Sequence, residues 1–361
     1  LNQQNEKANA PHYFVRSESM NYNYIKVPVL SVIFAGERIL ALVKRDNTLS
    51  VVIFNKELKV ESEIALLNAS KGFILDASKG RLLLSIDDKL VLIEDGEQRM
   101  VLKSGRPENF FWHATSAEYE VFVQEYGETP TGIFTSGDLE SWRRLIVNID
   151  LDKHSKHFHY ITYDPYRKWL IATLGDGCLT RVIYSEDFGE TWRSLYRGPW
   201  QFVPVEVLEE KIVFGMDSGI VRGGIGVYYP DSDYWSFIFL MWHDRKVRFA
   251  QMCDLEWLDN GIWIATFGTP QAVMVSKDLK IWYAAYIEGF DKQFNYNMSI
   301  AEGKDFVVCS TGKSLLKFDK RELEKLTQNA QPTLTSYKAY IDRLRGLGFT
   351  LKRKLFTLSN L

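Results

Sequence analysis

Short apolar runs separated by turn residues dominate the hydrophobic pattern of this chain. Each run is four to eight residues long, rich in β-branched or aromatic side chains, and bounded by glycine, aspartate or asparagine. Such runs predict β-strands, and they lack the 3.6-residue period of helices. The clearest are 29–35, 39–45, 49–55, 82–86, 90–94, 169–174, 212–215, 262–267 and 306–310.

One turn-like motif recurs along the chain. The segment 185-SEDFGETW-192 has similar copies in 136-SGDLESW-142 and 276-SKDLKIW-282, and a less similar one in 231-DSDYW-235. The aspartates at positions 138, 187, 233 and 278 are therefore separated by 49, 46 and 45 residues. A period of this length with four strands in each repeat is typical of a propeller blade. We predict an all-β, seven-bladed β-propeller; six blades remain an alternative, because the first two repeats lack the motif and the chain ends can combine in one blade.

The motif resembles the Asp-box, or bacterial neuraminidase (BNR) repeat, of sialidase-like propellers, whose consensus is Ser-x-Asp-x-Gly-x-Thr-Trp. That resemblance implies a turn between the third and fourth strands of a blade, away from the active site. The residues agree with a bracing role, because Ser185 and Asp187 can bind backbone N–H groups and Gly189 can adopt positive φ. Trp192 can fill the gap between blades. We interpret the motif as scaffolding.

The predicted domain boundaries are an N-terminal segment 1–24, a propeller domain 25–330 and a C-terminal extension 331–361. Within the extension, 336–358 contains six Lys or Arg and one acid, and 336–345 can form a short helix. This basic segment predicts either a strap across the propeller closure or a peripheral contact with a membrane or protein.

Composition narrows the class of partner. The formal net charge is −2 among 361 residues, so the chain has no overall basic field, and we expect no nucleic-acid partner. The three cysteines have no C-x-x-C spacing, which argues against a disulfide framework or a structural zinc site. No apolar run reaches the length of a membrane-spanning helix. The compartment is undecided, with the cytoplasm as a weak expectation.

Candidate catalytic carboxylates follow the predicted second strands of three consecutive repeats. They are Glu125, Asp176 and Asp217. Propellers keep their ligand sites around the axis, and paired carboxylates suit glycoside cleavage, one as acid and one as base or nucleophile. Each residue alone is also a common turn-capping residue.

A histidine cluster precedes the strand in the same central repeat. His157 and His159 alternate with Phe158, so in a strand they face one side. We predict that His159 takes part in catalysis and His157 in substrate binding. A metal there needs a third ligand, for which Asp176 is nearest, and the sequence alone leads us to assign neither metal nor cofactor.

Further candidate substrate-binding residues lie in predicted loops or at the starts of inner strands. These are Arg106, Trp200, Gln201, Arg222 and Arg248. Guanidinium groups bind carboxylates in a bidentate manner, and a flat aromatic ring can stack on a sugar. Sialidases use three arginines and an Arg-Ile-Pro element, and this chain has no Arg-Ile-Pro.

The sequence therefore favours a carbohydrate-active propeller that cleaves or binds a glycan or glycoconjugate at an axial pocket. Glycoside hydrolase-like cleavage is the first expectation. A non-catalytic glycan-binding or assembly scaffold and a metal-assisted polysaccharide lyase are alternatives, so enzyme activity stays open.

Overall fold

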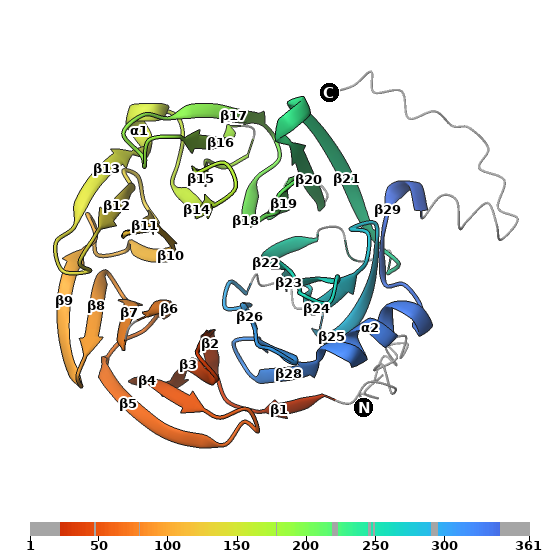
Figure 1. The fold of residues 1–361 in the computed structure, drawn as a ribbon, viewed down its shortest axis with the longest axis horizontal. Coiled ribbons are helices and arrows are strands. Elements are labelled where there is room, and N and C mark those ends of the chain that lie inside the picture. The colour runs from red at the N-terminus through yellow and green to blue at the C-terminus, as the bar shows by residue number, and fades with distance from the viewer. Residues whose placement is uncertain are drawn as a thin grey trace, which may run out of the picture.

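The computed structural model describes residues 22–46, 48–78, 80–177, 179–218, 223–244, 247, 250–289 and 295–339. Sheets of short antiparallel strands are arranged around a central axis (Figure 1). All nine strand runs predicted from the hydrophobic pattern are confirmed to within two residues. The mostly β character of the fold therefore follows directly from the spacing of apolar runs and turn residues.

Four sheets consist of four strands in chain order. The first contains β2 (Val29–Ala35), β3 (Arg38–Arg45), β4 (Thr48–Phe54) and β5 (Val60–Asn68). The second contains β6 (Gly72–Ser78), β7 (Arg81–Ile86), β8 (Lys89–Glu94) and β9 (Glu97–Lys103). The third contains β10 (Phe110–Ala117), β11 (Glu120–Tyr126), β12 (Gly132–Ser136) and β13 (Arg143–Val147). The fourth contains β14 (Phe158–Asp164), β15 (Trp169–Leu174), β16 (Thr180–Ser185) and β17 (Arg193–Gly198).

Another four-stranded sheet joins distant parts of the chain. It contains β26 (Ile300–Glu302), β27 (Phe306–Ser310) and β28 (Leu315–Asp319), with β1 (Asn23–Ile25) as its outer strand. Asn23 pairs with Lys317 and Ile25 with Leu315, in antiparallel register. The early strand β1 thus completes a late sheet and closes the ring.

The largest sheet has nine strands because a late segment joins two four-stranded runs. One run is β18 (Phe202–Val207), β19 (Ile212–Met216), β20 (Gly224–Tyr229) and β21 (Tyr234–Trp242). The other is β22 (Gln251–Trp257), β23 (Trp263–Thr269), β24 (Gln271–Ser276) and β25 (Ile281–Gly289). Between them lies β29 (Leu334–Ser336), which pairs with both β21 and β25.

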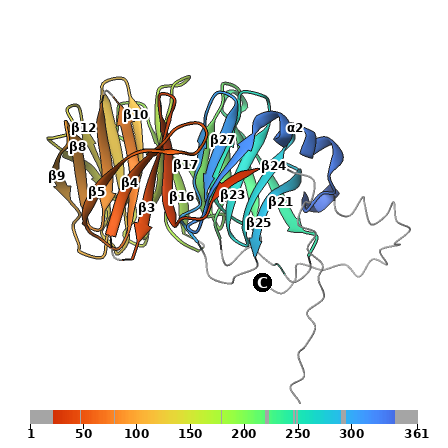
Figure 2. The same cartoon turned by 90° about the horizontal axis from the view of Figure 1, so that it is seen from below.

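Helices are few and peripheral in the part of the chain that the structure describes. They are α1 (Asn148–Leu151), the 3₁₀ helix Pro230–Ser232, α2 (Lys320–Asn329) and the helical residues 337–339 at the end of the described chain. The helix α2 lies at the outer edge in the side view (Figure 2). Asp319 caps it by accepting hydrogen bonds from the N–H groups of Arg321 and Glu322. No helix among the described residues has the length and apolar character needed to cross a bilayer.

The innermost strands contact one another in a closed ring. In order they are β2, β6, β10, β14, β18, β22 and β26, which again contacts β2. We call the face on which these strands begin the leading face. Apolar side chains fill the space between adjacent sheets, including the fully buried Trp263, Trp282, Phe122 and Phe214. The propeller therefore brings the strand ends of different sheets together around the axis.

The three Ser-x-Asp turns have the bracing geometry expected from their residues. In each, the serine hydroxyl accepts a backbone N–H and the tryptophan indole N–H donates to a turn carbonyl. The indole bonds are Trp142 to Leu139, 3.2 Å, Trp192 to Gly189, 3.0 Å, and Trp282 to Leu279, 3.0 Å. Gly189 has φ of +92°, which a glycine adopts without strain. These turns join the third and fourth strands of their sheets.

The less similar copy of the motif, 231–235, has a different structure. Pro230–Ser232 forms a 3₁₀ helix, and the Asp233 carboxylate accepts the Tyr228 hydroxyl at 2.9 Å. Trp235 lies within β21 and stacks on Phe237 and Phe202. The four recurring segments predict four equivalent tryptophans, and Trp142, Trp192 and Trp282 have the same indole bond while Trp235 does not; its segment has Asp231 where the others have a serine.

The predicted helix 336–345 is only partly covered by the described residues, of which 337–339 are helical, and the Ser336 Oγ accepts the Ala339 N–H at 3.3 Å. Ser336 is the last residue of β29, and its N–H donates to the Lys280 carbonyl. Residues 340–361 lie outside the described residues, as does most of the basic segment 336–358. The part that is described joins β21 to β25, away from the closure made by β1.

Candidate functional site

A triad of polar side chains lies at the start of β14 on the leading face. The Asp176 Oδ1 atom is 3.0 Å from Nε2 of His159 and 3.6 Å from Nε2 of His157. His157 directly precedes β14, and a bulge between Phe158 and Tyr160 shifts the register there. Asp176 follows β15, the neighbouring strand. The pairing of β14 with β15 therefore brings Asp176 beside two histidines that precede it by 19 and 17 residues in the sequence.

The triad has a strongly perturbed electrostatic environment. Burial alone would raise the pKa of Asp176, yet the interactions with the nearby His157 and His159 outweigh burial and hold that pKa well below its usual range. Burial lowers the pKa of His159, and the carboxylate of Asp176 opposes this effect. Lys156 adds a cation 3.1 Å from Asp176 Oδ2. Asp176 is therefore an anion surrounded by nitrogen groups.

Asp217 stands at the end of β19 in the next sheet, and its side chain is buried. Burial raises its pKa to about 7, the hydrogen bond from Gln251 Nε2 at 3.0 Å opposes this shift, and the negative charge of Asp176 adds to it. A carboxyl group with this pKa is partly protonated near neutral pH. Asp217 can therefore donate or accept a proton there.

An aromatic cluster adjoins the triad from the preceding sheet. The ring of Tyr126, the last residue of β11, lies 4.1 Å from the ring of His157 between centroids. It also contacts Trp112 at 4.8 Å and Phe110 at 5.3 Å. Tyr296, which precedes β26, lies 6.4 Å from Trp112. Rings from different sheets thus meet beside the polar groups.

Glu125 adjoins Tyr126 in the sequence but has a different role in the structure. Its Oε1 accepts the Gly105 N–H and the Asn109 side-chain N–H, both at 2.9 Å. Its Oε2 accepts the Gly132 N–H at 3.1 Å. The side chain is 3% exposed, so both oxygens are occupied within the third sheet. Glu125 is not part of the triad, because adjacent strand residues point to opposite sides and Tyr126 takes the position beside His157.

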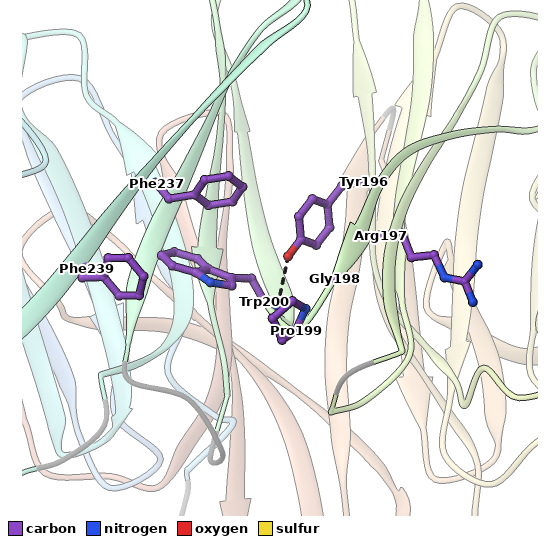
Figure 3. A pocket seen from close by; sticks show the side chains of 7 residues that line it. All are labelled: Tyr196, Arg197, Gly198, Pro199, Trp200, Phe237 and Phe239. Carbon is purple, nitrogen blue, oxygen red and sulfur yellow. Dashed lines mark hydrogen bonds between the residues drawn. The ribbon is translucent and has the colours of Figure 1, made fainter. Parts of the chain in front are cut away.

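Trp200 lies in a pocket between two outer strands. The pocket has a volume of about 360 Å³ and is lined by Tyr196, Arg197, Gly198, Pro199, Trp200, Phe237 and Phe239 (Figure 3). Trp200 is buried, with Phe237 and Phe239 packed edge-on against it. Since β17 and β21 are the fourth strands of their runs, this pocket is at the periphery and not beside the triad.

The other predicted binding residues are distributed unevenly. Gln201 lies next to Asp217, whose N–H donates to the Gln201 carbonyl at 2.8 Å. Arg106 is about half exposed and pairs with Glu108 at 3.8 Å. Arg222 and Arg248 lie outside the described residues. Among the predicted residues that the structure describes, His157, His159 and Asp176 have ligand atoms within 4.8 Å of one another, and Asp217 with Gln201 forms a second group.

Sequence reasoning missed Tyr126 and Gln251, and also a second carboxylate group on the innermost strands. The second group contains Glu206, Asp254 and Glu256, whose pKa values are all raised by burial. The Nζ atom of Lys320 lies 2.5 Å from Oε1 of Glu302 and 2.8 Å from Oδ1 of Asp259. The sequence signal for this carboxylate group is Asp254 and Glu256, two acidic residues at alternate positions of the mostly apolar run 251–257.

Comparison with known proteins supports the fold and leaves the family undefined. No family model matches the chain, and no curated protein sequence matches it. Similar solved structures are propellers, among them streptogramin B lyase, with a TM-score of 0.59 and 13% identity over 82% of this chain and 96% of that one. A chain of the mitotic checkpoint complex has a TM-score of 0.57 and 9% identity over 88% and 99%.

An enzyme is also among the similar structures. The GH74 enzyme of Niastella koreensis has a TM-score of 0.54 and 9% identity, covering 79% of this chain and 50% of that one. Identities this low show the fold alone. The protein is a β-propeller, and the similar propellers include the GH74 enzyme and a chain of the mitotic checkpoint complex, so the fold alone does not define a function.

Proposed function

We propose that the protein binds a carbohydrate at the axial end of its leading face and cleaves it, with Asp217 as the proton-transfer group. The observation that carries this proposal is the gathering of polar groups from neighbouring sheets. His157, His159 and Asp176 form one group, and Asp217 with Gln251 forms another whose pKa responds to the charge of Asp176.

The chemistry of these groups suits a hydroxylated ligand. A buried carboxyl group that titrates near pH 7 can protonate a glycosidic oxygen, as general acid catalysis requires. The anion of Asp176 and the amide of Gln251 offer hydrogen-bonding partners to sugar hydroxyls. The half-buried ring of Tyr126 offers an aromatic surface against which a sugar can pack.

The propeller proposed here has seven blades, one for each strand in the inner ring, with the nine-stranded sheet counted as two blades joined by β29. We extend its boundaries near 25 and 330 to include β1 and β29, since β1 pairs with β28 and β29 pairs with β21 and β25. The three Ser-x-Asp turns with the tryptophan bond support kinship with Asp-box propellers. The function proposed above does not depend on that kinship.

Glycan binding without cleavage is the alternative, and the Asp217→Asn variant separates the two. We would screen the wild type on a glycan array and follow bound glycans by mass spectrometry for cleavage products. Cleavage requires that Asp217→Asn still binds the glycan and forms product at least 100-fold more slowly, since general acid catalysis contributes about 10²–10⁴-fold. Binding with no product from the wild type would support the scaffold, and absence of glycan binding would refute both.

The matched control is Asp231→Asn. Asp231 lies in the 3₁₀ helix after β20, away from the triad and from Gln251. This variant should cleave at the wild-type rate. An equal loss of activity in both variants would contradict a specific role for Asp217.

A further inference from the structure

The histidine–aspartate triad has the donor set of a metal site. His157, His159 and Asp176 each offer one ligand atom, and these atoms all lie within 4.8 Å of one another. Two imidazoles and a carboxylate suit zinc, and three protein ligands leave a coordination position open for water or substrate. We propose that His157, His159 and Asp176 bind one divalent transition-metal ion, with Zn²⁺ the best match. The proposal does not rest on the carbohydrate function.

Hydrogen-bond accounting at His157 provides an independent argument. Its Nδ1 lies 2.6 Å from the Gly127 carbonyl oxygen, which only accepts, so Nδ1 carries a proton. In the neutral ring, Nε2 then has a lone pair. This Nε2 atom is buried and has no hydrogen-bond partner among the described residues, while Asp176 Oδ1 lies 3.6 Å away. A metal ion bound to both atoms would give this nitrogen the partner that it lacks among the described residues.

The bond from His157 Nδ1 to a backbone carbonyl also has the arrangement common to metal-binding histidines. Such histidines donate the proton of the second ring nitrogen to a carbonyl or carboxylate, which fixes the ring and the tautomer. The side chain of His157 is only 12% exposed, and Tyr126 packs against its ring. The nitrogen that faces Asp176 is therefore pre-oriented.

His159 and Asp176 complete the donor set with one change of protonation. His159 Nε2 lies 3.0 Å from Asp176 Oδ1 and 3.1 Å from the Gly175 carbonyl, so without metal it donates its proton to them. Metal binding through Nε2 moves the proton to Nδ1, which is buried and without a partner among the described residues. The Gly175 carbonyl oxygen, 3.1 Å from His159 Nε2, then lies near the metal position. Lys156 pairs with Oδ2 of Asp176, which leaves Oδ1 as the ligand atom.

A protonated His157 is the competing explanation. An imidazolium donates from both nitrogens, to Gly127 and to Asp176, and needs no metal. The two explanations differ in one observable, since only the metal site takes up one equivalent of a transition metal. Metal binding is therefore measured directly, with no need for a substrate.

The test uses the full chain without an affinity tag, treated with EDTA and dialysed. Titration with ZnCl₂ by calorimetry should give one site per chain, and CoCl₂ should give visible absorption bands of a bound ion. His157→Gln and Asp176→Asn should each weaken Zn²⁺ binding at least 100-fold. His154→Gln is the matched control, because His154 is an exposed histidine of the same segment. Circular dichroism establishes that each variant is folded.

Each result of these titrations either supports or overturns the metal site. Stoichiometric binding that is lost in both ligand variants and kept in His154→Gln supports the site. Absence of Zn²⁺ and Co²⁺ binding at millimolar concentration, or binding that is equal in the wild type and in the folded Asp176→Asn variant, overturns it and leaves the imidazolium pair. Since no glycan enters these assays, a negative result here is separate from failure of the carbohydrate proposal.

Discussion

The Glu125→Gln variant tests whether Glu125 braces the third sheet. Gln has the same shape, yet one of its two terminal atoms is an NH₂ group that donates instead of accepting. If the Gln oxygen takes the place of Oε1, it keeps the bonds from Gly105 and Asn109, and the NH₂ group then faces the N–H of Gly132. The variant therefore leaves a buried donor without an acceptor.

The magnitude follows from these three bonds. A buried donor that loses its acceptor costs about 1–3 kcal/mol. The two remaining bonds change from a charged to a neutral acceptor, which weakens each by roughly 1 kcal/mol. We expect a loss of about 3–5 kcal/mol in the free energy of unfolding, a large part of the ~5–15 kcal/mol typical of a folded domain.

Urea denaturation followed by tryptophan fluorescence measures this loss. Glu140→Gln serves as the control, because Glu140 is exposed and makes only a surface ion pair with Arg99, worth about 0–1 kcal/mol. A Glu125→Gln midpoint equal to that of the wild type would refute the brace. A variant that unfolds normally but loses cleavage of a glycan would instead return Glu125 to the catalytic site.

Three further predictions follow from other parts of the molecule. Between pH 4 and pH 7 the folded protein holds a proton on Asp217 that the unfolded chain has released, so stability falls as pH rises through this range; Asp217→Asn should remove up to about 4 kcal/mol of that fall, measured as the difference in urea stability between pH 4 and pH 8. If the wild type and Asp217→Asn have parallel pH profiles, the buried-acid assignment is wrong. Asp187→Ala removes turn bonds to Thr191 and should cost on the order of 1 kcal/mol without changing Zn²⁺ affinity, and a loss of that affinity would contradict the scaffolding role. Leu334→Ala should cost about 2–5 kcal/mol by calorimetry, because Leu334 is fully buried between β21 and β25, and an unchanged melting temperature would show that β29 does not stabilise this sheet.

The strands could be predicted from the sequence because each is a short apolar run ended by a turn residue. The triad could also be anticipated, since His157 and His159 are separated by one residue and Asp176 follows the next strand. The bulge after Phe158 changes the register locally but leaves both histidines beside Asp176.

The orientation of Glu125 relative to the triad could not be read from the sequence. A shift of one residue at a strand end reverses the side to which a side chain points, and the sequence does not mark where β11 ends relative to the axis. The segment before Trp235 differs from the other three turns for a related reason. Asp231 stands where they have a serine, and Pro230–Ser232 forms a 3₁₀ helix. Tyr126 and Gln251 could not be singled out, since their relation to the site arises only from pairing between neighbouring sheets.

The closure by β1 has a consequence for the order of folding. Asn23 pairs with Lys317, 294 residues later, so the strand that is synthesised early must wait for one of the last strands to emerge. Until then β28 has an open edge with unpaired N–H and C=O groups, which can pair with another chain. The docking of β1 therefore belongs to the late steps of folding, and the species that precedes it exposes a strand edge to aggregation.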